Sequence, residues 1–254
     1  MDAINFLSRE QAVLQGIPFK DAVALGQVPF WRGFRKFGMN DGVPSSGMEE
    51  MWPVGTVKVW PSAAAVASTV SSDAADDGAG TGTRTLVIEG LDASFNEVSE
   101  TITMDGVTPV LTTQTFLRIN RAYGLTAGSG GVNAGNISIS VGGDLQAYVE
   151  AMEGQTHQTH YTVPAGHVLI VDNFTIGVGR LSGSADCHVA SSVRDATSAN
   201  PHWRAISDVY LYQNIHQNNG SSTVIPSKYD IVQTVASTSA TQAFSVYSGY
   251  LVKQ

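Results

Sequence analysis

Three histidines are the residues whose types and spacing come closest to a metal site. His157, His160 and His167 stand near one another in the sequence, and imidazole nitrogens are common zinc ligands. In an extended strand, however, the side chains of His157 and His160 would point to opposite faces, and no Glu or Cys stands at a helpful spacing. We therefore predict solvated histidines in strands or loops, without a metal.

Carboxylates form the second chemical candidate. Asp73, Asp76 and Asp77 lie in a glycine-rich stretch, but an EF-hand calcium loop needs acids at alternate positions and a distal Glu. Glu97 and Glu100 lie on a regular hairpin, whereas a glycosidase needs two carboxylates about 5 to 10 Å apart in a cleft. The sequence also lacks a nucleophile elbow of the type G-x-S-x-G. These observations predict a protein that is not an enzyme and has no metal or other cofactor.

A β-hairpin is the element around which the rest of the chain is organised. The stretch TRTLVIEGLDASFNEVSETITM, residues 83–104, has two β-rich halves joined by the turn sequence LDASFN. In the second half Val98, Ile102 and Met104 fall on one face of a strand and polar residues on the other. Such a hairpin buries its apolar face against a second sheet. It predicts an all-β fold of one or two tandem antiparallel β-sandwich units, jelly-roll-like, with an N-terminal helical or extended arm.

Composition restricts the possible partners. The chain of 254 residues is 43% hydrophobic and only 14% charged, and its formal net charge is −8. The negative charge argues against nucleic acid, since phosphate binding needs a basic face. The longest apolar runs are shorter than the roughly 20 residues of a membrane span, and we expect no secretory signal at the N-terminus. The lone Cys187 permits no intramolecular disulfide, which favours a buried thiol and a reducing compartment.

Residues 1–50 differ from the rest and are predicted to form an N-terminal helix and a docking arm. The segment Asp2 to Gln15 has the apolar spacing of a short amphipathic helix. Aromatic and basic side chains then interleave, and they are the candidate docking residues: Phe30, Trp31, Arg32, Phe34, Arg35 and Phe37. Such residues can pack on their own core, dock onto a neighbouring subunit or partner, or bind nucleic acid or a membrane. Acidic residues on both sides weaken the last alternative.

The remainder of the chain is predicted to form two domains. Residues 51–145 make a first β-sandwich domain and residues 146–254 a second one, each with turn signals and patterned strands. Trp203, Tyr210 and Tyr212 in the second domain are candidates for a sugar-binding platform, because aromatic faces stack on pyranose rings. Aromatic residues of a sandwich lie more often in the core or at a subunit interface.

Two stretches of the body carry a resemblance to known proteins. They are TRTLVIEGLDASFNEVSETITMDGVTPVLTTQTFLRINRAYGLTAGSGGVNAGNI, and YTVPAGHVLIVDNFTI followed by IPSKYDI. Together they resemble a loosely defined group of virion structural proteins from tailed bacteriophages. The likeness covers the chain from residue 83 to the C-terminus and does not extend clearly to the arm.

The resemblance implies a structural role with protein partners and no catalytic residues. The first hypothesis is a capsid decoration or cement protein that binds the head surface through its arm and its oligomer contacts. Its partners would be the major capsid protein or other virion proteins, and it would form a homo-oligomer, preferably a trimer, assembled in the host cytoplasm and located in the virion. The alternative is a tail or adhesion component that binds host surface glycans. The sequence does not distinguish head from tail.

Overall fold

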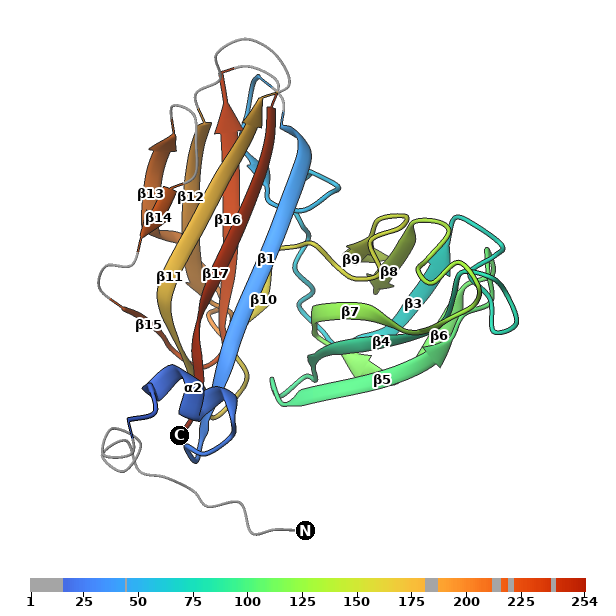
Figure 1. The fold of residues 1–254 in the computed structure, drawn as a ribbon, viewed down its shortest axis with the longest axis horizontal. Helices are drawn as coiled ribbons and strands as arrows, with labels where there is room; N and C mark the ends of the chain where they lie inside the picture. The colour runs from blue at the N-terminus through green and yellow to red at the C-terminus, as the bar shows by residue number, and fades with distance from the viewer. Residues whose placement is uncertain (1–15, 44, 181–186, 212–215, 219–221, 239–240) are drawn as a thin grey trace.

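The chain forms an all-β protein. The structure, a computed structural model, describes residues 16–43, 45–180, 187–211, 216–218, 222–238 and 241–254. Strands make up 58% of the described residues and helix 3%, and the strands gather in two units (Figure 1). The predicted all-β class is confirmed, in the form of small antiparallel sheets. The helix predicted from Asp2 to Gln15 lies outside the described residues.

The middle unit, residues 65–149, contains two sheets that share one core. One sheet has the strand order β6-β3-β8-β9 and the other the order β5-β4-β7. Leu86, Phe116 and Ile139 are fully buried between them. The strands are β3 (Ala65–Ser71), β4 (Thr83–Leu91), β5 (Glu97–Thr103), β6 (Val110–Phe116), β7 (Arg118–Ala127), β8 (Ile137–Val141) and β9 (Asp144–Val149).

The predicted hairpin is confirmed as β4 and β5. These strands pair in register from Thr85 with Thr103 to Leu91 with Glu97. Ile102 is buried in the shared core, while residues at alternate positions of β5 are exposed. The period of two in the sequence therefore reports a real division between a core face and a solvent face.

The outer unit is built from the strands up to residue 50 and from residue 161 onward, and it also contains two sheets. One has the order β1-β17-β11-β14, with β15 on β11, and the other has the order β10-β16-β12-β13, with β2 on β16. Leu169, Val189 and Tyr247 are among the residues buried in its core clusters. The strands are β1 (Trp31–Val43), β2 (Glu49–Glu50), β10 (Tyr161–Thr162), β11 (His167–Arg180), β12 (Cys187–Asp195), β13 (Arg204–Leu211), β14 (His216–Asn218), β15 (Thr223–Ile225), β16 (Tyr229–Ser237) and β17 (Thr241–Lys253).

The middle unit is inserted into one strand position of the outer unit. Glu50 of β2 pairs with Thr234 of β16, and Tyr161 of β10 pairs with Ile231 further along the same strand. Both strands run antiparallel to β16, so together they occupy one position that the middle unit interrupts. The predicted tandem order of residues 51–145 and 146–254 is corrected to an insertion, because strand pairing joins segments that flank the middle unit.

β1 belongs to the outer sheet and not to a separate arm. It pairs with β17 from Trp31 with Val252 to Val43 with Thr241, and the two strands lie side by side in Figure 1. The short helix α2 (Phe19–Ala24) packs beside them, with the Phe19 ring 5.2 Å from that of Trp31. The predicted docking arm of residues 1–50 is therefore corrected for residues 19–43, which sheet pairing and aromatic packing hold on their own body.

Candidate functional site

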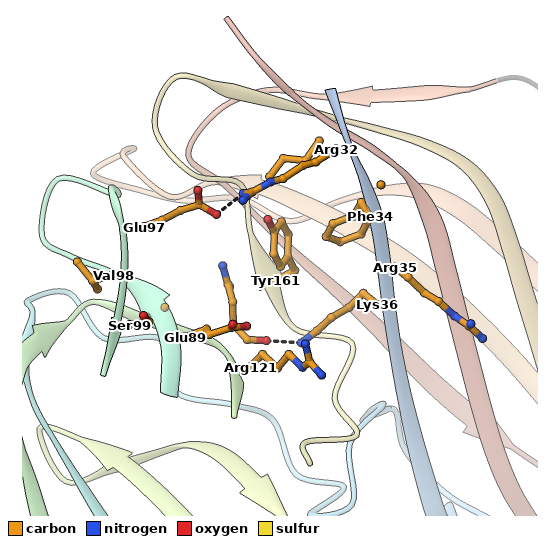
Figure 2. Close-up of a pocket in the computed structure, with 14 residues that line it drawn as sticks. Arg32, Phe34, Arg35, Lys36, Glu89, Glu97, Val98, Ser99, Arg121 and Tyr161 are labelled. Carbon is orange, nitrogen blue, oxygen red and sulfur yellow. Dashed lines mark hydrogen bonds and ion pairs between the residues drawn. The ribbon is translucent and has the colours of Figure 1, made fainter. Parts of the chain in front are cut away.

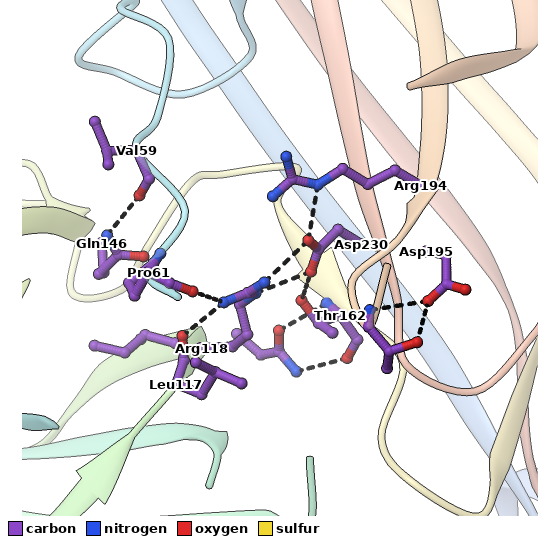
Figure 3. Close-up of polar contacts among 12 residues, drawn as sticks. Val59, Pro61, Leu117, Arg118, Gln146, Thr162, Arg194, Asp195 and Asp230 are labelled. Carbon is purple, nitrogen blue, oxygen red and sulfur yellow. Dashed lines mark hydrogen bonds and ion pairs between the residues drawn. The ribbon is translucent and has the colours of Figure 1, made fainter. Parts of the chain in front are cut away.

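The two units meet at a buried cluster of charges centred on Asp230 (Figure 3). Asp230 of β16 is fully buried, and its carboxylate accepts hydrogen bonds from Nε and Nη2 of Arg118, at 2.9 and 3.1 Å. Arg194 donates to the same carboxylate through Nε at 3.0 Å, and Thr162 donates through Oγ1 at 2.6 Å. Arg118 lies on β7 of the middle unit, and the others lie on the outer unit. The cluster therefore joins the two units with charge-assisted bonds.

A second polar network lies where the chain leaves and re-enters the outer unit. Glu50 Oε2 lies 2.6 Å from His160 Nε2 and accepts the Lys58 backbone amide at 2.8 Å. Burial lowers the pKa of His160 to about 4, so the imidazole is neutral at pH 7 and donates to Glu50. His160 is 1% exposed and packs against the rings of Trp52 and Trp60. The prediction of a solvated histidine is wrong for His160, because this network and these rings enclose it.

The other candidate metal ligands are separated from one another. His157 Nδ1 lies 3.5 Å from Glu153 Oε2, and His167 Nδ1 lies 2.9 Å from the carbonyl oxygen of Ala165. Within the described ranges, no three His, Cys, Asp or Glu side chains come together in a group able to hold a metal ion. The three histidines therefore have separate surroundings in the fold.

A groove of about 520 Å³ lies between β1 and the three-stranded sheet (Figure 2). The rings of Phe34 and Tyr161 line it from the outer unit, with their centroids 4.7 Å apart. The opposite wall carries Ser99, Glu89 and Arg121, which are neighbours across β5, β4 and β7. The groove thus combines an aromatic surface with polar and charged groups.

Two cations of β1 cross the groove to the middle unit. Arg32 forms an ion pair with Glu97 of β5, and both side chains are about half exposed. Lys36 is buried, and its Nζ donates a hydrogen bond to the carbonyl of Asn120 in β7. Burial, reinforced by the charge of Lys58, lowers the pKa of Lys36 to about 7. β1 is therefore a contact strand between the units as well as part of a sheet.

The buried lysines predict that stability rises with pH. Burial lowers the pKa of Lys58, like that of Lys36, to about 7 in the folded chain, whereas an unfolded lysine has a pKa of about 10.4. Between these values the unfolded chain binds more protons, so the free energy of unfolding increases as the pH rises from 7 to 9. We expect a gain of about 2 kcal/mol per lysine in urea unfolding. Lys58→Met should reduce this gain, and an unchanged or falling stability of the original chain would contradict the assignment.

The six predicted docking residues have different surroundings. Trp31 packs against α2, and Phe34 packs between Tyr161 and Tyr247. Arg32 forms its ion pair with Glu97 across the groove, and the ring centroids of Phe37 and His157 lie 5.2 Å apart. The exposed members of the set are Phe30, Arg32 and Arg35, and Phe30 is 72% exposed. Docking onto a partner stays a prediction for these exposed residues, whereas Trp31 and Phe34 support their own subunit.

The candidate glycan-binding aromatics do not form one described platform. The ring centroids of Trp203 and Trp60 lie 5.6 Å apart, and the guanidinium of Arg194 lies 4.5 Å from the centroid of the Trp203 ring. Tyr210 is 63% exposed and stacks on His188, with ring centroids 4.3 Å apart. Tyr212 lies outside the described residues. Trp203 therefore belongs to the cation and aromatic cluster near the unit interface, and Tyr210 belongs to a separate surface pair.

The sequence reasoning missed the residues that join the units. Arg118 and Asp230 are 112 residues apart in the chain, and His160 and Glu50 are 110 apart. Spacing rules act over a few residues and cannot connect such pairs. One signal was present: Asp230 interrupts the apolar strand YDIV, and a charge inside a buried strand needs a partner.

Comparison with known proteins assigns no family to the chain. No protein-family model matches it, and no curated protein matches its sequence. Among the residues that the structure describes, no helix combines the length and apolar character needed to cross a membrane. Function is therefore inferred from the fold and from the interface between the units.

Proposed function

We propose that this chain is a non-enzymatic structural protein of a tailed-bacteriophage virion, in the role of a capsid decoration or cement protein. It binds the head surface through exposed residues of its N-terminal region and through oligomer contacts. Its partners are the major capsid protein or other virion proteins. A homotrimer is the favoured assembly, because closed symmetry uses one surface several times. The chain assembles in the host cytoplasm and ends in the virion.

The strand order of the outer unit is the observation that supports this proposal most directly. Its sheets have the orders β1-β17-β11-β14 and β10-β16-β12-β13, and β2 shares the strand position of β10. This order supports an eight-stranded jelly roll, a fold built from two Greek keys. We infer that the outer unit is a jelly-roll sandwich carrying the middle unit as a second sandwich. Jelly rolls occur in viral capsid and lectin domains, so the support is an analogy of fold.

The use of the buried charged groups also favours a structural role. Arg118, Arg194 and Thr162 donate to the Asp230 carboxylate. The Glu50 carboxylate accepts from His160 and from the Lys58 amide. The Asp230 cluster holds the inserted unit against the outer unit, and the Glu50 network joins the two segments that connect them. A general acid or base would instead have to reach a bound substrate. Their present bonds support a rigid two-unit body.

Replacing Phe30 is expected to separate docking from folding. Phe30 has a positive φ of 68°, which is unfavourable by about 1 to 2 kcal/mol for a residue with a side chain. Its backbone carbonyl accepts the Lys253 amide at 2.8 Å, a bond that Phe30→Gly retains. We expect the variant to melt within a few degrees of the original chain but to cosediment at least tenfold less with phage heads that lack this protein.

A matched control is available on another strand. Val224 of β15 is 61% exposed, so Val224→Ala also removes an exposed apolar side chain. The proposal expects this variant to bind heads normally. Equal binding by the Phe30 variant and the original chain would remove Phe30 from the contact. Failure of the original chain to bind heads would contradict the decoration role.

The second candidate is a tail or adhesion component that binds host surface glycans. The observation that favours it is the exposed Tyr210 ring stacked on His188, whose Nε2 contacts the Asp208 carboxylate. An aromatic face beside polar groups suits a sugar ring with hydroxyl groups. Glycan-array binding by the original chain that is lost in Tyr210→Ala, without head binding, would favour this candidate.

A further inference from the structure

The edge of β1 beside the groove carries unpaired backbone groups. β1 is the last strand of its sheet and pairs only with β17 within the described part of the chain. The Met39 amide donates to the carbonyl of His157 at 3.3 Å, so at Met39 the backbone points away from β17. In an antiparallel pair this direction repeats at every second residue. The N–H and C=O groups of Gly33 and Arg35 therefore also point away from β17.

These two residues border the groove. Gly33 and Arg35 both line it, and Figure 2 shows the Arg35 side chain directed away from it, so Arg35 contributes its backbone. No described group forms a hydrogen bond with the outward backbone groups of either residue. A Cβ atom at Gly33 would have no atom within 4 Å apart from those of its neighbours in the chain. The strand edge is thus open toward the groove, as in sheets that accept an added strand.

The charges of the groove differ in balance from those of the whole chain. The chain has 14 Lys and Arg residues against 22 Asp and Glu. The groove, in contrast, is lined by three basic side chains, Arg32, Lys36 and Arg121, and by two acidic ones, Glu89 and Glu97. Lys36 is buried with a carbonyl group as its hydrogen-bond acceptor, and no described carboxylate lies within ion-pair distance of its Nζ. A carboxylate bound beside Lys36 would favour the protonated form of the lysine and form an ion pair with it.

We propose that the groove binds an extended, carboxylate-bearing peptide segment of another protein, which adds to the outer sheet as a strand on β1. The peptide backbone pairs with Gly33 and Arg35. Its alternate side chains point into the groove, where a Glu or Asp side chain meets Lys36 and the Phe34 and Tyr161 rings take an apolar neighbour. This inference rests on the proposed role as a virion binding protein and names the chemistry of one partner.

Two synthetic peptides and the purified full chain test the inference. The first peptide is Thr-Val-Thr-Glu-Thr-Val-Thr with both ends blocked, which places valine and glutamate on one face of a strand, and the second has lysine in place of glutamate. We expect the acidic peptide to bind at least tenfold more tightly in NMR titration. We also expect it to slow hydrogen exchange at the Gly33 and Arg35 amides of the original chain, because these amides gain acceptors.

Substitutions at one position separate strand addition from other modes of binding. Gly33→Pro removes the outward amide, and proline is tolerated on edge strands whose N–H faces away from the sheet. It should weaken acidic-peptide binding at least tenfold, whereas Gly33→Ala keeps the amide and should bind within twofold of the original chain. Lys36→Met should abolish the preference for the acidic peptide.

Three results would overturn the inference. They are equal binding by Gly33→Pro and Gly33→Ala, equal affinity of the original chain for both peptides, and unchanged exchange at Gly33 and Arg35 at millimolar peptide. Head binding is measured separately with the Phe30 variant. A failed peptide test therefore leaves the proposed function standing, and a failed head-binding test does not change the peptide result.

Discussion

Asp230→Ala is expected to destabilise the protein by about 3 to 5 kcal/mol, because it leaves buried guanidinium groups without their carboxylate. Asp230 is fully buried between Arg118 and Arg194, whose side chains are 5% and 13% exposed. Urea unfolding followed by tryptophan fluorescence measures the loss. Proteolysis should also become faster near residues 51–61 and 150–160, which connect the two units, because the cluster no longer fixes the units to each other.

An exposed ion pair between the same two units provides the matched control for Asp230. Arg32 and Glu97 have side chains that are 52% and 43% exposed, and such pairs contribute at most about 1 kcal/mol. Glu97→Ala should therefore change the free energy of unfolding by less than that amount. The triple variant Asp230→Ala, Arg118→Met, Arg194→Met should recover part of the lost stability, because the two added substitutions remove the uncompensated charges. Equal effects of Asp230→Ala and Glu97→Ala would contradict the importance of burial at this cluster.

Asp76→Ala is expected to cost about 3 kcal/mol or more, because buried donors that lose an acceptor each cost about 1 to 3 kcal/mol. The Asp76 carboxylate is fully buried and accepts four hydrogen bonds between 2.6 and 2.9 Å. The donors are the Ser71 hydroxyl and the backbone amides of Thr83, Ala134 and Gly135. These bonds tie the glycine-rich segment before β4 to the segment before β8. Thermal unfolding of the variant measures the cost.

The adjacent aspartate serves as the control for Asp76. Asp77 accepts one hydrogen bond through its side chain, from the exposed Ala79 amide at 2.9 Å. Asp77→Ala should therefore change stability by less than about 1 kcal/mol, as is usual for surface positions. The sequence analysis considers both residues for calcium binding and rejects them, because their spacing does not fit an EF-hand loop. If the two substitutions had the same small effect, Asp76 would not be the anchor of this segment.

Local patterning predicted the strands but not how the units are connected. The alternation around Ile102 follows from the contact of one hairpin face with the core, and it is visible within a few residues. The pairing of Trp31 with Val252, in contrast, joins residues near opposite ends of the sequence. Nothing in the residues around Trp31 specifies that partner. The sequence therefore predicts an arm from the aromatic and basic segment, although part of this segment is a strand of the outer sheet.

The candidate site was predictable only where a residue's role depends on its immediate surroundings. Phe30 stands out as an aromatic residue near the start of β1, and the structure leaves it exposed. The prediction for His160 is wrong because the residues that bury it, Glu50 and Trp52, precede the inserted unit in the sequence. The unpaired edge of β1 was not predictable either, since an edge is defined by the absence of a neighbour in three dimensions.

Electron cryomicroscopy of tailed-phage particles assembled in the presence of this chain, with a tag fused at its C-terminus, tests the proposed role most directly. Gln254 lies next to β17, where its amide donates to Gly166, so the tag marks the outer unit. We expect tag density at regular positions on the head surface, with Phe30 and the β1 edge turned toward neighbouring proteins. A tag that is missing from purified particles, together with a monomeric chain in the lysate, would contradict the proposal.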